Sequence, residues 1–167
     1  DTFTGKQKPD FILGQNNFAT TTSGSSPNQL NYPGQVSSDG KHLAVADTNN
    51  RRILIWDLPI RENGQQPSVI WDSNSANGFS LYTFNLPKGV FIYEDRLFVS
   101  DTGNNRVLIW SKLPRNNQDK PDIVLGQKDF YGRKPSNAKD GLFSPVYLAF
   151  DGHFLWVGEF KWSDRLL

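Results

Sequence analysis

Two lines of polar residues in the sequence have the residue types that bind metal ions. Each line carries an aspartate, then an asparagine three positions later and an arginine five positions later: Asp47, Asn50, Arg52 and Asp101, Asn104, Arg106. Carboxylate and amide oxygens are ligands of hard cations, but the spaced acidic series of a calcium loop is missing. Asp, Asn and Gly also stabilise tight turns. We therefore interpret these six residues as structural, with each arginine reaching a carboxylate or a backbone carbonyl group.

The two histidines are the other candidates for metal or acid–base chemistry. His42 follows Asp39-Gly40 and His153 follows Asp151-Gly152, but the two histidines are one residue out of register with each other. Two histidines cannot form a metal-binding triad, and no hydrolase, zinc-protease, phosphate-loop or dinucleotide-binding motif occurs. We predict no catalytic residue, no metal ligand and no cofactor. A divalent cation on a central axis stays open as an alternative.

These candidates lie in a sequence repeat, which determines the elements that must position them. Residues 43–56 align without gaps on residues 97–110, and a third copy follows with Leu155-Trp156-Val157-Gly158-Glu159. Each copy holds short apolar or β-branched runs separated by turn residues, which predicts strands. Four antiparallel strands in a repeat of about 40–50 residues are typical of a β-propeller blade.

The predicted architecture is a single all-β domain over residues 1–167, with twelve strands in three four-stranded blades. The blades span approximately residues 19–71, 72–125 and 131–167, and a strand at 9–14 completes a neighbouring blade. Propellers close with about 4–8 blades. The chain is therefore expected to be part of a longer propeller or half of a six-bladed ring that a homodimer completes. The lack of any methionine, including at position 1, agrees with a fragment.

Two segments of the second repeat carry a family resemblance. Pro87-Lys88-Gly89-Val90 and residues 97–107 resemble the NHL repeat. The resemblance implies a propeller of about six blades that is used mostly as an interaction platform. Some family members bind RNA or proteins, and a minority are enzymes, including lyases with a histidine-bound metal. The Leu-Gly-Gln-x-x-Phe elements at 13–18 and 125–130 are similar to those of bacterial NHL-repeat proteins, many of them secreted, which favours an extracellular or periplasmic location.

Composition excludes several classes of partner. The chain has 18 Lys and Arg against 17 Asp and Glu, so its net charge of +1 provides no general attraction to nucleic acid or to anionic lipid. There is no cysteine, and no run of about 18 apolar residues that could span a membrane, so we expect a soluble protein without disulfides. Residues 128–134 mix basic and aromatic side chains as single-stranded nucleic-acid sites do, but Asp129 dilutes their charge.

The third repeat departs from the pattern, and its divergent residues are the candidates for ligand binding. Glu159 replaces the aspartate, and Lys161 and Trp162 lie where the other repeats have their turn. Trp56 and Trp110 share one repeat position and are expected in the core. The predicted function is a non-catalytic binding or scaffold module that recognises protein or carbohydrate through its loops. The alternatives are a propeller-type hydrolase or lyase with an axial metal, and an RNA-binding NHL domain.

Overall fold

The computed structural model describes residues 5–72, 83–160 and 162–167, and it confirms the all-β prediction. Each complete blade is one antiparallel four-stranded sheet with its strands in chain order. The first sheet is formed by β1 (Pro33–Ser38), β2 (His42–Asp47), β3 (Arg52–Asp57) and β4 (Val69–Asp72). The second is formed by β5 (Gly89–Tyr93), β6 (Arg96–Asp101), β7 (Arg106–Trp110) and β8 (Ile123–Leu125). A third sheet pairs β9 (Pro145–Phe150) with β10 (Leu155–Glu159).

The described residues contain ten strands instead of the twelve predicted. Residues 9–14 form no strand, because no strand lies beside them in the described part of the chain. Leu13 instead packs on Val45, Leu54 and Trp56 and so covers the outer face of the first blade. The expected third strand of the last blade is reduced to a bridge between Gly158 and Leu166.

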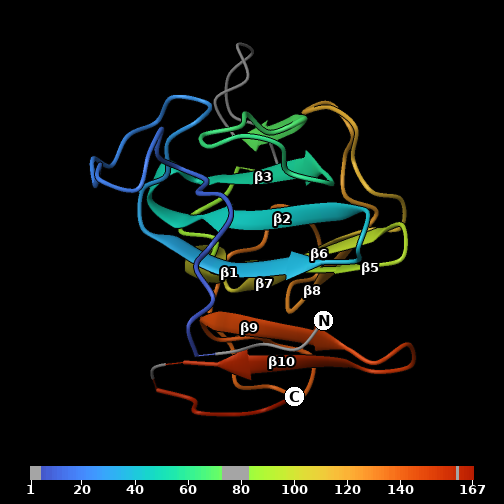
Figure 1. Ribbon diagram of the computed structural model, residues 1–167. Helices are drawn as coiled ribbons and strands as arrows, with labels where there is room; N and C mark the ends of the chain where they lie inside the picture. Colours follow the sequence, from blue (N-terminus) through green and yellow to red (C-terminus); the bar gives the residue numbers. More distant parts are fainter. Residues whose placement is uncertain (1–4, 73–82, 161) are drawn as a thin grey trace.

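The innermost strands of the three sheets lie next to one another. Figure 1 shows β3, β2 and β1 following one another downward in the first sheet, with β9 and β10 below them. The backbone N–H of Gln35 in β1 donates to the carbonyl oxygen of Lys88 just before β5, at 2.8 Å. A Cβ atom at position 89 would collide with the carbonyl oxygen of Val146, so only glycine allows β5 to lie this close to β9. The three blades therefore converge on a common axis, as in a propeller.

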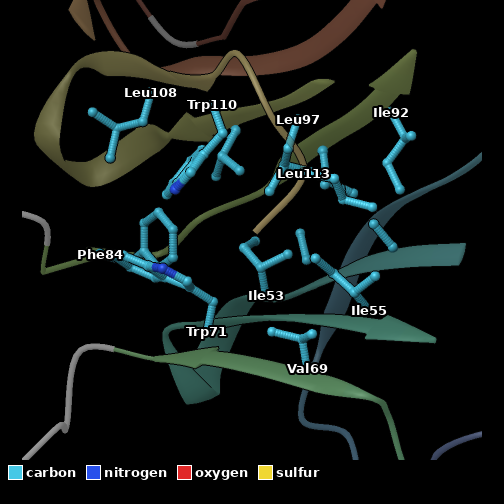
Figure 2. Packing of buried hydrophobic residues seen from close by; sticks show 14 residues of the cluster. Ile53, Ile55, Val69, Trp71, Phe84, Ile92, Leu97, Leu108, Trp110 and Leu113 are labelled. Atoms are coloured by element: carbon cyan, nitrogen blue, oxygen red, sulfur yellow. The ribbon is translucent and has the colours of Figure 1, made fainter. Parts of the chain in front are cut away.

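The main hydrophobic core lies between the first and second blades. In Figure 2, Ile53, Ile55 and Val69 of the first blade face Ile92, Leu97 and Leu113 of the second. Trp71, Phe84 and Trp110 pack beside them, with the Trp71 and Trp110 ring centroids 5.3 Å apart in an edge-to-face arrangement. The carbonyl oxygen of Asp119 accepts hydrogen bonds from both indoles, so this packing also joins the blades through polar contacts.

A 3-10 turn follows the second strand of each complete blade, η1 (Thr48–Asn50) and η2 (Thr102–Asn104). The turns contribute to the blade interfaces through their first residue. The Thr48 hydroxyl donates to the carbonyl oxygen of Pro87 at 2.8 Å, and the Thr102 hydroxyl to that of Pro145 at 2.6 Å. Each Thr hydroxyl thus links its own blade to the innermost strand of the next.

One buried hydroxyl is left without a partner in the described residues, that of Ser100. Ser100 is fully buried, and Ala46 holds the same repeat position in the first blade, also fully buried. We expect Ser100→Ala to raise the free energy of unfolding by about 1 kcal/mol, because it removes an unsatisfied polar group without leaving a cavity. Chemical denaturation would measure this gain. Ser37→Ala is the matched control and should destabilise, because the Ser37 hydroxyl accepts the Ile92 N–H.

In the part of the chain that the structure describes, no helix has the length and apolar character to cross a membrane.

Candidate functional site

The repeated polar lines form buried ion pairs that fasten the loop entering each blade. The Arg52 Nε atom lies 2.7 Å from Asp47 Oδ2, and the Arg106 Nε atom lies 2.7 Å from Asp101 Oδ2. The other guanidinium nitrogens of Arg52 donate to three backbone carbonyl groups in residues 25–29. Arg106 makes the corresponding contact with the carbonyl group of Thr83 in the loop entering the second blade, and it also donates to the carbonyl group of Phe130. These contacts of the two arginines are with other groups of the chain. They give the repeated polar residues a structural role.

The same carboxylates accept two further hydrogen bonds at equivalent positions. The Oδ1 atoms of Asp47 and Asp101 accept the backbone N–H groups of residues 31 and 85. The Nδ2 groups of Asn50 and Asn104 donate to the Oδ2 atoms. Each aspartate therefore connects a blade's incoming loop, its 3-10 turn and its third strand.

Glu159 takes part in the same network in the third blade, although the sequence marks it as divergent. Its carboxylate accepts the Arg165 Nε–H at 2.7 Å, the Ser163 hydroxyl at 2.8 Å and the Phe143 N–H at 2.6 Å. Its side chain is fully buried. The loop between the acidic residue and the arginine is one residue longer in the third blade: Arg165 follows Glu159 by six positions, whereas Arg106 follows Asp101 by five. The longer glutamate side chain accompanies this longer loop.

The structure does not gather the three candidate ligand residues into one described site. Glu159 points into the blade, while Trp162 is 82% exposed in the following loop with a φ of 60°. Lys161 lies outside the described residues. A ligand role for the three stays a prediction, and Glu159 would have to exchange one of its present hydrogen bonds to serve in it.

Glu159 also makes the third blade sensitive to acid. Burial alone would raise the pKa of Glu159, but hydrogen bonds from Arg165, Phe143 and Ser163 outweigh it and hold the pKa below its ordinary value of 4.5. A lowered pKa in the folded state contributes stability above pH 4.5 that is lost as the pH falls through the folded-state pKa.

We expect Glu159→Gln to lower the free energy of unfolding by about 1–3 kcal/mol at pH 7, because the uncharged amide cannot form an ion pair with Arg165. The difference from the unsubstituted chain should shrink as the pH falls below about 4.5, where Glu159 is protonated in the unfolded state. Urea denaturation at a series of pH values measures both stabilities. A difference that stays constant from pH 7 to pH 3 would contradict this assignment.

The histidines lie in separate environments. The His42 Nδ1 atom is 3.1 Å from Asp39 Oδ2, and its Nε2 atom is 3.3 Å from a guanidinium nitrogen of Arg115 and 3.7 Å from Asp57 Oδ1. His153 is exposed in a different hairpin. Outside the masked positions, no group of three or more His, Cys, Asp or Glu side chains lies close enough together to hold a metal ion. The axial cation stays an untested alternative.

A depression of about 400 Å³ lies where the innermost strands begin, and we call it the axial mouth. Residues from all three blades line it: Tyr32, Gly34, Gln35, Thr48, Lys88, Val146, Tyr147 and Phe160. Tyr32, Tyr147 and Phe160 are 71%, 67% and 51% exposed. Large aromatic side chains with open faces are typical of binding surfaces.

Some polar side chains of the axial mouth are engaged in hydrogen bonds between blades, and Lys88 contacts an aromatic ring. The Gln35 side-chain amide forms two hydrogen bonds with the backbone of Leu148 in β9, at 2.9 and 3.2 Å, and thereby ties the first blade to the third. The Thr48 hydroxyl donates to the Pro87 carbonyl group. The Lys88 ammonium lies 5.7 Å from the centroid of the Phe160 ring, in a cation–π contact. Among the described residues that line the mouth, Lys88 is the only one with a charged side chain.

Tyr32, Lys88 and Tyr147 are not among the residues that the sequence predicts to bind a ligand. A signal was nevertheless present, because aligned positions differ in type from blade to blade. Lys88 corresponds to Gly34 in the first blade, and Tyr147 corresponds to Gly89 in the second. Positions that hold glycine in one blade and a long side chain in another are candidates for a surface that differs around the axis.

A second, wider groove of about 1110 Å³ lies between the outer part of the second blade and β10. Ile123 and Leu125 of β8 border the open side of the second blade and are 45% and 37% exposed. Val69 and Trp71, at the same repeat positions in the first blade, are only 7% and 4% exposed. Within the described residues, the core between the second and third blades buries Val107 and Ile109 of β7 but does not extend over Ile123 and Leu125 of β8.

The basic stretch at 128–134 lies along this outer groove. Lys128, Arg133 and Lys134 line it together with Asp129 and Asp140. Lys139 lines the groove as well, so two carboxylates accompany four basic side chains there and reduce the positive charge that would attract a nucleic-acid backbone.

About half of this chain is similar in sequence to a short part of much longer proteins. No family model matches the chain. Over 86 residues it is 37% identical to NHL repeat-containing protein 2 of Gallus gallus and 36% identical to NHL repeat-containing protein 2 of Homo sapiens. The Bos taurus protein of the same name is 34% identical over 86 residues. Each match covers 48% of this chain but only 11% of the relative.

Proposed function

Since the chain is an NHL-repeat protein whose blades meet at an open axial mouth, we propose that it is a non-catalytic binding module that holds a peptide segment of a partner protein there. The observation that carries the proposal is the lining of the mouth. Three exposed aromatic side chains from two blades surround one depression, on a backbone that hydrogen bonds between blades hold in place. A preformed site of this kind reduces the entropy lost on binding.

The lining favours a peptide over a carbohydrate. A sugar presents many hydroxyl groups and needs many hydrogen-bonding partners in its site. In the axial mouth both ends of the Gln35 amide are engaged with Leu148, and the Thr48 hydroxyl donates to Pro87. The remaining side-chain polar groups are the Tyr32 and Tyr147 hydroxyls and the Lys88 ammonium. Such a site suits an apolar or aromatic side chain with few polar groups around it.

A random heptapeptide display library, selected on the 167-residue chain, tests this proposal. We expect recurring sequences with an aromatic or large apolar residue, and their binding should fall at least tenfold in the double variant Tyr32→Ala, Tyr147→Ala. Phe154→Ala, which removes another exposed aromatic side chain away from the mouth, is the matched control and should leave binding unchanged. Selected peptides that bind the double variant as tightly as the unsubstituted chain would overturn the proposal.

The homodimer that completes a six-bladed ring stays a prediction, and light scattering coupled to size exclusion would test it. In that ring, the outer face of the first blade must receive a blade of the second chain. Leu54 and Trp56 on that face are already buried to 0% and 1% exposure, with Leu13 and Leu30 packed against them. Ring closure would therefore require the segment that contains Leu13 and Leu30 to move.

A further inference from the structure

Lys88 is placed to give the axial mouth a charge preference. It is half-buried immediately before β5, and its ammonium group lies over the Phe160 ring of the third blade. None of the described residues that line the mouth is an aspartate or a glutamate. Within the part of the chain that the structure describes, Lys88 forms no ion pair at 4.0 Å or less. In this described lining, the Lys88 ammonium group therefore has no neutralising carboxylate.

A lysine in this environment is more favourable with an anionic ligand than without one. Contact with an aromatic ring partly replaces the water around an ammonium group, and it compensates its charge only weakly. A carboxylate that reaches the same ammonium forms a charge-assisted hydrogen bond, and the partly apolar surroundings screen that bond less than bulk water does. The neighbouring aromatic side chains can at the same time contact the apolar part of the ligand.

We infer that the axial mouth recognises an acidic peptide, in which an Asp or Glu carboxylate binds Lys88 while a neighbouring apolar side chain lies against Tyr147 and Phe160. This inference rests on the proposed function and adds the chemical class of the ligand. The number of charges favours a peptide over RNA. A nucleic-acid backbone carries one charge per nucleotide and is bound by several basic side chains together, whereas the described lining of the mouth offers one.

The test compares selections from the heptapeptide library on the unsubstituted chain and on Lys88→Gln. The unsubstituted chain should enrich Asp or Glu at one position beside the apolar residue, and Lys88→Gln should lose that enrichment while keeping the apolar one. A selected peptide is then synthesised with its acidic residue intact and as the matching amide. We expect the amide form to bind the unsubstituted chain about fivefold to tenfold more weakly, and Lys88→Gln to bind both forms within about twofold.

Lys88→Arg is the matched control, since it keeps the charge at the same position and should retain the acidic preference. If Lys88→Gln does not fold, the salt dependence of the unsubstituted chain replaces it: binding of the acidic peptide should weaken with added salt, and that of the amide should not.

Each outcome separates this inference from the proposed function. Equal binding of the two peptides to the unsubstituted chain would overturn the acidic preference and leave peptide binding intact. Failure of the library to yield any peptide that depends on Tyr32 and Tyr147 would overturn both. Displacement of the peptide by a twelve-nucleotide oligouridine at lower concentration, with steep salt dependence, would overturn the acidic-peptide inference in favour of RNA.

Discussion

Replacing Arg106 with alanine is expected to lower the free energy of unfolding by about 3–5 kcal/mol, as measured by urea denaturation at pH 7. Arg106 and Asp101 are both fully buried, and their side chains meet at 2.7 Å. In the variant the Asp101 carboxylate stays in the core, where Asn85 and Asn104 are its remaining hydrogen-bond donors among the described residues. Burying an uncompensated charge costs far more than the net contribution of a paired one.

The dependence of this loss on pH identifies its cause. Burial raises the pKa of Asp101, and the charge of Arg106 is the largest effect that opposes it. Removing Arg106 raises the pKa further, so Asp101 takes up a proton in the folded variant as the pH falls. A raised pKa in the folded state is a cost above that pKa and is relieved below it. The difference in unfolding free energy between the variant and the unsubstituted chain should therefore narrow as the pH falls from 7 toward the ordinary aspartate pKa of 3.8.

Arg165→Ala is the matched control for Arg106→Ala. It removes the equivalent pair with Glu159, but Arg165 is 25% exposed, so water can reach the site from which the guanidinium group is removed. The loss of stability should be less than half of that in Arg106→Ala. Equal losses in the two variants would contradict the view that desolvation of Asp101 sets the size of the effect.

Trp110→Ala should destabilise the chain by about 3–5 kcal/mol, because it opens a cavity between the first two blades. Trp110 is 1% exposed, contacts the rings of Trp71 and Phe84, and donates its indole N–H to Asp119 at 2.9 Å (Figure 2). Because these neighbours belong to both sides of the interface, the loss should appear as weaker docking of the blades as well as lower stability. Thermal unfolding followed by near-ultraviolet circular dichroism reports both.

Two variants at tryptophan positions give this prediction its controls. Trp162→Ala removes a side chain that is 82% exposed and should change the stability by no more than about 0.5 kcal/mol. Trp110→Phe keeps an aromatic ring but loses the hydrogen bond, and should fall between the two. A loss below about 1 kcal/mol for Trp110→Ala would show that the interface repacks around the missing ring.

The fold was largely predictable from the sequence because the repeat carries it. Residues 43–56 and 97–110 form the same strand–turn–strand units at the same spacing, as their alignment predicts. The strand expected at 9–14 failed for a physical reason: an apolar run becomes a strand only beside a hydrogen-bonding neighbour. Leu13 instead packs against the outer face of the first blade. This packing depends on tertiary contacts, which the local sequence pattern does not contain.

The candidate site was less predictable, because a residue that departs from a repeat can either preserve the structural contacts of that repeat or serve another purpose. Glu159 departs from the pattern and yet preserves the hydrogen bonds that Asp47 and Asp101 make, with Ser163 in place of the asparagine. Lys88 looks like an ordinary member of the repeat motif, yet it supplies the charge of the axial mouth. Only the position of a side chain relative to the axis separates these cases, and a one-dimensional alignment does not contain that position.

The position that follows each acidic residue shows how such a scaffold can acquire new specificity. Thr48 and Thr102 use it to link one blade to the next, whereas Phe160 at the same position presents an aromatic ring to the mouth and to Lys88. A substitution at this one position therefore replaces a hydrogen bond between blades with an aromatic ring in the axial mouth. The change costs about one hydrogen bond. In a ring of such repeats, one blade can change at this position while the corresponding hydrogen bonds of the other blades maintain the fold.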